Sequence, residues 1–219
     1  MILFSAVDYE ECASAYQWHR GFAGANDALF PRHHDDFQLM VLQGSVWAAR
    51  DANGDFLALA YANYDEQSKL CEVGGLMVAA QVRNRGLGST IMRLTLAHML
   101  VEENLLEIPG VRVIAHVLKA NQEPRPIIEG ALRFHLRTQV SYDASDLPGL
   151  RVEEDGRVHG DEFEITLPDT LHALAGWARS WTGAIGDGTA DVEMRTGVRM
   201  SDWAAALEQL AEQHGNSNA

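Results

Sequence analysis

The amino-acid sequence predicts an α/β fold with a mixed, mostly antiparallel sheet flanked by helices. Three observations support this prediction. Asn53 and Gly54 form a turn signal between two strand-like runs, which is typical of a β-hairpin. A third strand-like run, Lys69–Val78, follows the hairpin and extends it into an antiparallel meander. The amphipathic stretch Leu87–Leu105 and the β-branched run Val111–Leu118 come next, and this order predicts a right-handed βαβ unit with parallel strands.

The segments before the hairpin are expected to form a strand and two helices. Met1–Val7 is apolar and is followed at once by acidic residues, so it fits a first strand better than a signal peptide. Glu10–Phe22 places its apolar residues at helical intervals. A shorter helix is predicted from Asp35 or Asp36 to Gln43.

The segments after the βαβ unit are expected to form another helix, Pro126–Arg137, a hairpin within Arg151–Val158, and a strand, Phe163–Leu167. Two amphipathic helices, Leu171–Trp181 and Ser201–Gln213, follow with a loose link over Gly183–Gly188. We therefore predict a first domain over residues 1–167. Residues 168–219 would form a mainly helical part of a C-terminal α/β extension.

Composition and charge exclude several classes of protein. The chain has 219 residues, 47% of them apolar, and no run approaches the ~18 consecutive apolar residues of a membrane helix. Its formal net charge of −14 opposes binding to nucleic acid or to anionic lipid. It could attract cationic amines, or simply keep the protein in solution. Two cysteines are too few for a disulfide framework, which predicts a reducing, cytoplasmic setting.

The loop Gln81–Thr90 lies between the third predicted strand and the long helix. Amides at the start of a helix bind phosphate, and glycines at 86 and 88 would let a ligand approach the backbone closely. Arg83 and Arg85 add positive charge, so the loop fits a pyrophosphate. The alternative is an ordinary left-handed turn before a helix. The glycine spacing matches neither a dinucleotide-binding fingerprint nor a P-loop.

The whole stretch Leu76–Gly88 resembles the acyl-CoA-binding motif of the GNAT acetyltransferase superfamily. That motif, Gln/Arg-x-x-Gly-x-Gly/Ala after an apolar strand, is matched by Arg83, Gly86 and Gly88. The order of predicted elements extends the resemblance over residues 1–167. It implies the GNAT fold, with acetyl-CoA bound where the sheet splits beside the βαβ unit.

The resemblance also implies which residues bind the cofactor. The backbone of residues 83–89 would hold the pyrophosphate, and Leu76 and Val78 would pair with the pantetheine arm, with the N–H of Leu76 facing the thioester carbonyl. Asn121 would contact the same arm, although an ordinary turn residue is the alternative. The full set is Leu76, Met77, Val78, Arg83, Asn84, Arg85, Gly86, Leu87, Gly88, Ser89 and Asn121.

Glu72 and His135 are the candidate catalytic residues. Glu72 lies fourteen residues before Gly86, the spacing at which several GNAT enzymes carry a glutamate base, and apolar neighbours would raise its pKa. Otherwise it is an exposed strand glutamate. His135 stands where a similar Ala-x-x-x-Tyr segment carries the tyrosine that protonates the thiol, with Tyr142 as the alternative acid and a packing histidine as the other interpretation.

Other conspicuous residues have simpler interpretations. The run His33-His34-Asp35-Asp36 fits a loop and a helix cap better than a metal site, and no metal is expected. The tryptophans of the C-terminal helices are expected to pack, and His116, in an apolar strand, is expected to be a satisfied core histidine.

The resemblance implies direct transfer of an acetyl group from acetyl-CoA to a primary amine of a small molecule or a protein. The C-terminal extension could form a lid, a homodimer contact or part of the acceptor pocket. The alternative is a noncatalytic acyl-CoA-binding or protein-interaction module, because fold does not determine function.

Overall fold

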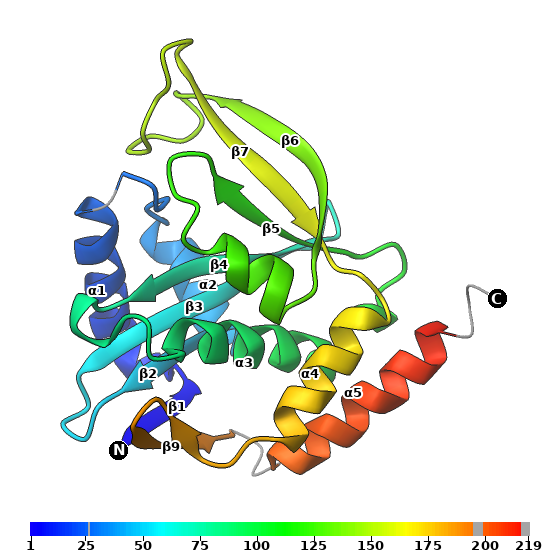
Figure 1. Ribbon diagram of the computed structural model, residues 1–219. Coiled ribbons are helices and arrows are strands. Elements are labelled where there is room, and N and C mark those ends of the chain that lie inside the picture. Colours follow the sequence, from blue (N-terminus) through cyan, green and yellow to red (C-terminus); the bar gives the residue numbers. More distant parts are fainter. Residues whose placement is uncertain (26, 195–198, 216–219) are drawn as a thin grey trace.

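A computed structural model describes residues 1–25, 27–194 and 199–215 of the chain. These residues form one mixed sheet flanked by helices, with strand order β6-β7-β5-β4-β3-β2-β1-β9-β8 (Figure 1). The strands are β1 (Ile2–Ala6), β2 (Val46–Arg50), β3 (Phe56–Asp65), β4 (Leu70–Val78), β5 (Arg112–Leu118), β6 (His135–Asp143), β7 (Arg157–Glu164), β8 (Ala184–Ile185) and β9 (Gly188–Glu193). The α-helices are α1 (Cys12–Gly24), α2 (His34–Leu42), α3 (Leu87–Val101), α4 (Asp169–Arg179) and α5 (Met200–Gly215).

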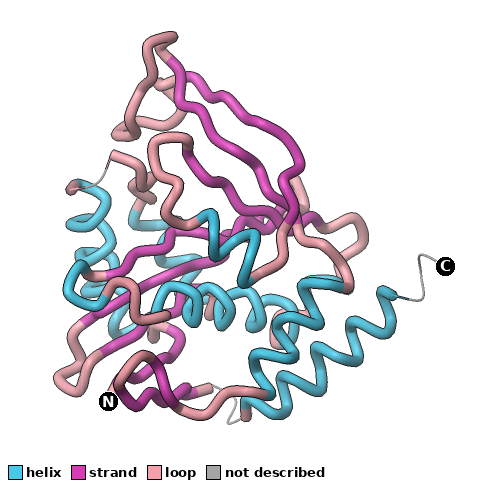
Figure 2. The backbone as a smooth tube through the Cα atoms, in the orientation of Figure 1, coloured by secondary structure: helices cyan, strands magenta, loops and turns pink. Residues whose placement is uncertain are grey.

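Helices cover both faces of the central strands, as Figure 2 shows in the same view. On one face α3 packs into the larger apolar cluster, which includes Ile91 and Leu94. On the other face α1 and α2 pack into a second cluster through Ala15 and Phe37. Because β2 and β3 lie between these clusters, their small and apolar residues are buried on both sides.

The predicted meander of β2, β3 and β4 is confirmed as antiparallel. The Asn53-Gly54 turn closes its first hairpin. The Asp51 carboxylate accepts hydrogen bonds from the N–H groups of Asn53 (2.8 Å) and Asp55 (3.0 Å), and Gly54 has φ +87°. An aspartate that binds nearby amides and a left-handed glycine together fix such a turn.

The predicted βαβ unit is also confirmed, since β4 and β5 are parallel and α3 connects them. Their pairing covers only Leu70–Glu72 on β4 and Arg112–Ile114 on β5. The rest of β4 separates from β5, so the sheet splits just beyond Glu72. This split has the position that the family resemblance implies.

A β-bulge in β4 controls which side chains face each way beyond the split. The register with β3 shifts between Leu59 and Tyr61, opposite Gly75, which has φ +60°. A Cβ atom at Gly75 would overlap the Tyr61 ring, so only glycine fits there. Because of the bulge, Leu76 packs on the α3 side, whereas Met77 joins the opposite cluster.

The predicted helix Pro126–Arg137 is wrong beyond Ala131. A short π-helix, Ile127–Ala131, is followed by Arg133 with φ +59°, and then by strand β6. The predicted hairpin within Arg151–Val158 is wrong as well, because β7 pairs with β6 across the long connection 144–156. Non-local pairing outweighs local helix propensity here.

The two predicted C-terminal helices are confirmed as α4 and α5, which pack along each other (Figure 1). The interpretation of Gly183–Gly188 as a loose link is wrong, because this segment begins a small hairpin of β8 and β9. β9 adds to the sheet parallel to β1, with Ile2 opposite Ala190. No helix among the described residues is long and apolar enough to cross a membrane. The domain boundary after Leu167 stays a prediction.

Candidate active site

The predicted phosphate loop lies between β4 and α3. Gly86 is the residue before the helix and has φ +87°, a left-handed conformation in which a side chain would be strained. The Thr90 N–H already donates to Gly86 O (3.0 Å), so the helix begins its internal hydrogen bonds there. The amides of residues 87–89 therefore precede the first helical bond and are the donors that an anion at this end can use.

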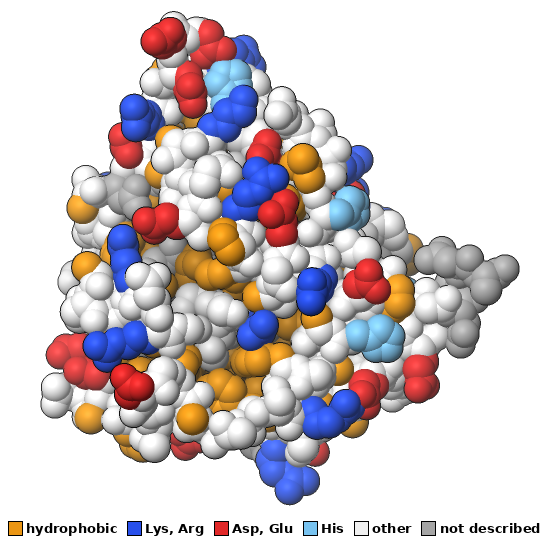
Figure 3. Space-filling view, in the orientation of Figure 1, with side chains coloured by type: hydrophobic (Ala, Val, Ile, Leu, Met, Phe, Trp, Pro, Cys, Tyr) orange, Lys and Arg blue, Asp and Glu red, His pale blue; other side chains and the backbone are white. Residues whose placement is uncertain are grey.

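A cleft of about 640 Å³ opens beside this loop. It is lined by Phe22, Leu76, Val78, Val82, Arg83, Asn84, Gly86, Leu87, Gly88, Ser89, Asn121, Glu123, Pro124, Pro126 and Ile127. A Cβ atom at Gly88 would lie only 3.3 Å from Ile127 Cδ1 and 3.4 Å from Leu76 Cδ2, so glycine keeps this wall of the cleft thin. Figure 3 shows the face of the molecule that Figure 1 presents, hollowed near its middle with hydrophobic side chains exposed in the hollow.

Most of the predicted cofactor-binding residues lie together around this cleft. The exceptions are Met77 and Arg85, which are absent from its lining. Met77 is 1% exposed and packs on the opposite face of the sheet. Arg85 is exposed on the outside of the loop, beside Gly186 of the C-terminal hairpin. The sequence does not reveal the bulge that turns Met77 to the opposite face or the hairpin that lies beside Arg85.

Arg83 connects the loop to the opposite wall. Its Nε donates to Val78 O (3.3 Å), and its guanidinium lies 3.8 Å from the Glu123 carboxylate. Asn121, just past the end of β5, holds that wall by accepting a hydrogen bond from the Glu123 N–H (3.2 Å). The two walls of the cleft thus come from the two strands that separate at the split.

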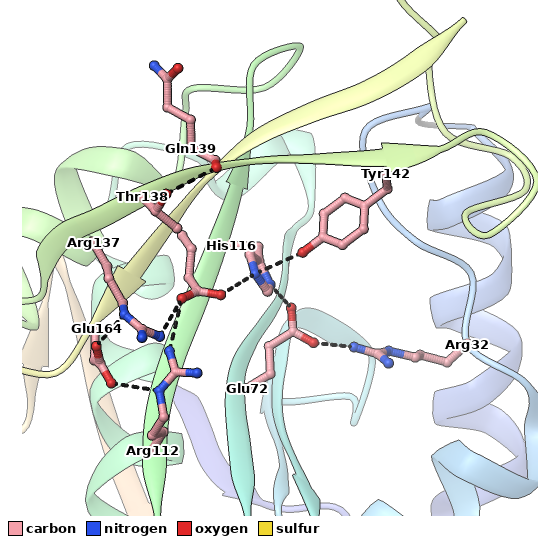
Figure 4. Close-up of polar contacts among 10 residues, drawn as sticks. Arg32, Glu72, Arg112, His116, Arg137, Thr138, Gln139, Tyr142 and Glu164 are labelled. Atoms are coloured by element: carbon pink, nitrogen blue, oxygen red, sulfur yellow. Dashed lines mark hydrogen bonds and ion pairs between the residues drawn. The ribbon is translucent and has the colours of Figure 1, made fainter. Parts of the chain in front are cut away.

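A chain of polar side chains crosses the sheet at the split (Figure 4). Glu72 on β4 accepts a hydrogen bond from Arg32 (2.9 Å) and lies 2.8 Å from Nδ1 of His116 on β5. On the other side of the ring, His116 Nε2 is 3.1 Å from the hydroxyl of Tyr142 on β6. We call Glu72, His116 and Tyr142 the relay.

The electrostatics of the relay overturn one expectation. Burial alone would raise the pKa of Glu72, but hydrogen bonds from His116 and Arg32 and their charges lower it to about 2. The expected raised pKa of Glu72 is therefore wrong, because sequence reasoning saw its apolar neighbours and not its two cationic partners. Burial would lower the pKa of His116, yet Glu72 and Glu162 raise it above its ordinary value. Burial and the same two carboxylates raise the pKa of the Tyr142 phenol.

The relay continues into a ladder of ion pairs. Glu162 Oε2 lies 3.4 Å from His116 Nε2, and its other oxygen binds Arg112 (2.9 Å) and Arg137 (3.0 Å). Glu164 binds the same two arginines. These side chains all lie on one face of β5, β6 and β7, and the two arginines balance the two glutamates. His116 is thus the member of the ladder that can change charge near neutral pH.

His116 is satisfied, as the sequence predicts, but its partners are polar side chains of the site and it is not fully buried in the core. It stands on β5 between Glu72 and Tyr142, with its side chain 19% exposed. His135, the first candidate acid, lies at the start of β6, where its Nδ1 is 2.9 Å from Thr166 Oγ1. The structure brings Tyr142 to the relay instead, and a catalytic role for His135 stays a prediction.

His116 and Arg32 are the site residues that sequence reasoning missed. A histidine in an otherwise apolar strand beside a strand with a glutamate was the available signal for His116. Arg32 gave no comparable signal. Among the described residues, no group of His, Cys, Asp and Glu side chains is arranged to hold a metal ion.

Comparisons with known proteins identify the fold. No protein-family model matches the chain. No curated protein matches it in sequence either. Among solved structures it is similar to an N-acetyltransferase from Staphylococcus aureus Mu50, with 13% identity and a TM-score of 0.54 over 75% of this chain and 98% of that chain. NAA60 of Arabidopsis thaliana, in complex with acetyl-CoA, matches with 17% identity and a TM-score of 0.51 over 75% and 97% of the two chains.

A third similar structure is the diaminobutyrate acetyltransferase EctA of Paenibacillus lautus, in complex with its substrate and coenzyme A. It matches with 15% identity and a TM-score of 0.51 over 74% of this chain and 94% of that chain. At identities this low, the structural similarity establishes the fold alone. The chemistry must be argued from the residues of the site. The chain therefore has the fold of the GNAT N-acetyltransferases, as its sequence motif implies.

Proposed function

We propose that the protein is an N-acetyltransferase that moves an acetyl group from acetyl-CoA directly to a primary amine. The observation that carries the proposal is the position of the relay where β4 and β5 separate, four residues along β4 from Leu76, which lines the cleft beside the glycine loop. Similar solved structures contain acetyl-CoA or coenzyme A, which supports the same assignment.

The cleft suits coenzyme A in shape and in chemistry. The amides of residues 87–89 and the positive end of α3 would hold the pyrophosphate. The apolar side chains of Leu76, Val78 and Ile127 would line the pantetheine arm. The N–H of Leu76 follows the bulge at Gly75, and we propose that it donates to the thioester oxygen as negative charge develops there.

The relay can remove the proton from the attacking amine. In the neutral tautomer with its hydrogen on Nδ1, His116 donates to Glu72 and accepts from the Tyr142 hydroxyl at Nε2. As the amine nitrogen bonds to the carbonyl carbon, its proton passes through Tyr142 to His116. The carbon–sulfur bond then breaks, and the same path returns the proton to the departing thiolate.

This mechanism gives Glu72 a positioning role in place of the base role suggested by its spacing. A carboxylate with a pKa of about 2 is a weak base at neutral pH. It can nevertheless orient the imidazole and make it more basic, because the paired carboxylate favours the protonated ring. Arg32 in turn holds the carboxylate in place (2.9 Å).

The acceptor is proposed as a primary amine of a small molecule or a protein. The substrate of the similar diaminobutyrate acetyltransferase, L-2,4-diaminobutyric acid, is one small amine to include in a panel. The negative net charge of the chain favours cationic acceptors over anionic ones.

The test is calorimetric titration with acetyl-CoA, followed in the same sample by thiol release across amines of both classes. Micromolar binding with amine-dependent thiol release is expected. Tyr142→Phe should lower turnover by about 10²–10⁴-fold without changing acetyl-CoA affinity. Glu164→Gln, which alters a ladder glutamate that pairs with arginines, is the matched control. Binding with no turnover would favour a noncatalytic acyl-CoA-binding module, and absence of binding would refute the proposal.

A further inference from the structure

The C-terminal hairpin of β8 and β9 packs against the outside of the phosphate loop. Ile185 Cγ1 lies 3.6 Å from the position that a Cβ atom of Gly86 would occupy. At the tip, the corresponding position of Gly186 is 3.5 Å from Arg85 Cβ and 3.6 Å from Arg85 O. The hairpin therefore touches the two loop residues that immediately precede helix α3.

Ile185 is a buried residue at an exposed edge of the molecule. It is 8% exposed and belongs to the same apolar cluster as Leu87 and Ile91 of α3. Gly86 has no side chain of its own to pack. Ile185 therefore lies against one side of Gly86, whose remaining surface is exposed.

The hairpin is held in place independently of the loop. β9 pairs with β1 from Ile2 opposite Ala190 to Ser5 opposite Glu193. The Ala190 N–H donates to Gly183 O (2.8 Å), which closes the base of the hairpin. The hairpin that contacts the loop is thus anchored to β1, at the end of the sheet opposite β6.

We propose that Ile185 is a positioning residue for cofactor binding, which holds the phosphate loop in its binding conformation. This inference rests on the proposed function. A glycine without neighbouring contacts can adopt many backbone conformations. A ligand that binds only the left-handed conformation then binds more weakly. By packing on Gly86, Ile185 removes that freedom before the pyrophosphate arrives. The C-terminal segment thereby acts on the phosphate end of the cofactor and leaves the thioester end untouched.

The test compares acetyl-CoA with S-acetylpantetheine, which keeps the thioester and the arm but lacks the pyrophosphate. In Ile185→Ala we expect the Kd for acetyl-CoA to rise about tenfold. The kcat/KM with S-acetylpantetheine should not change, because that molecule does not reach the loop. Ile185→Val, which keeps most of the contact, should restore affinity to within about threefold of the original.

The control is Leu174→Ala, which removes a fully buried side chain from α4. It should lower thermal stability without a selective loss of acetyl-CoA binding relative to the reaction with S-acetylpantetheine. An unchanged Kd in Ile185→Ala, or an equal loss with both thioesters, would overturn the inference. Failure of the unaltered protein to bind acetyl-CoA would instead refute the proposed function. If Ile185→Ala does not fold, Ile185→Val decides by the same comparison, with an expected rise in Kd of about two- to threefold.

Discussion

Replacing Glu72 by glutamine should lower the pKa of His116. Glutamine is nearly isosteric, and its single side-chain oxygen can still accept a hydrogen bond from His116 Nδ1, whereas its amide nitrogen cannot accept the hydrogen bond that Arg32 donates to Glu72. What His116 loses is the negative charge 2.8 Å from its Nδ1. Because this charge favours the protonated ring, its removal favours the neutral ring.

The size of the shift follows from the contact. A hydrogen bond to a charged partner contributes about 1.5–3 kcal/mol, and one pKa unit corresponds to about 1.4 kcal/mol. The two side chains are 19% and 28% exposed, so solvent screens the pair only in part. Glu162 remains 3.4 Å from Nε2 and retains some of the effect. The pKa of His116 should therefore fall by about 1–2 units.

The assay is NMR titration of the histidine side chains, with the His116 signal assigned from the spectrum of His116→Asn. This measurement needs no acceptor. In the unaltered protein the transition should lie above the ordinary histidine value of about 6.5. Once an acceptor is found, kcat/KM should rise with pH through the same transition, because the neutral ring accepts the proton.

The matched control is Glu164→Gln, since Glu164 pairs with Arg112 and Arg137 in the same ladder. It should move the His116 transition much less than Glu72→Gln does. A transition that stays in place in Glu72→Gln, or that shifts equally in both variants, would refute the role given to Glu72.

Three further predictions concern the loop, the bulge and the core. Gly86→Trp should abolish acetyl-CoA binding in calorimetry, because it strains a left-handed position at the edge of the cleft and pushes the indole against Ile185, which displaces the loop; normal affinity would contradict the phosphate-loop assignment. Gly75→Ala should destabilise the protein by about 1–3 kcal/mol or more through overlap with Tyr61. Gly54 is also left-handed but has open space around it, so Gly54→Ala should lower the free energy of unfolding by less. Denaturant unfolding measures both variants, and equal losses would show that the overlap with Tyr61 is relieved. Leu174→Ala should cost about 2–5 kcal/mol in the same measurement, and a cost below 1 kcal/mol would mean that the core refills the cavity.

The sequence by itself determined the parts of the protein that depend on neighbouring residues. The Asn53-Gly54 hairpin, the βαβ unit and the loop before α3 each have a local cause: a turn type, a hydrophobic period or a glycine at a helix start. These features were enough to predict the fold class and most of the cleft.

Only the tertiary structure decided which side chains form the relay and which segments become strands at the two ends of the sheet. Glu72, His116 and Tyr142 come from three strands, and the pKa of each depends on partners that sequence spacing does not reveal. β6 and β9 were missed for the same reason, since each is a strand only because a distant segment offers it hydrogen bonds. Local sequence sets the conformational preferences of a segment, but side-chain pairing and sheet order depend on contacts that form only when the whole chain has folded.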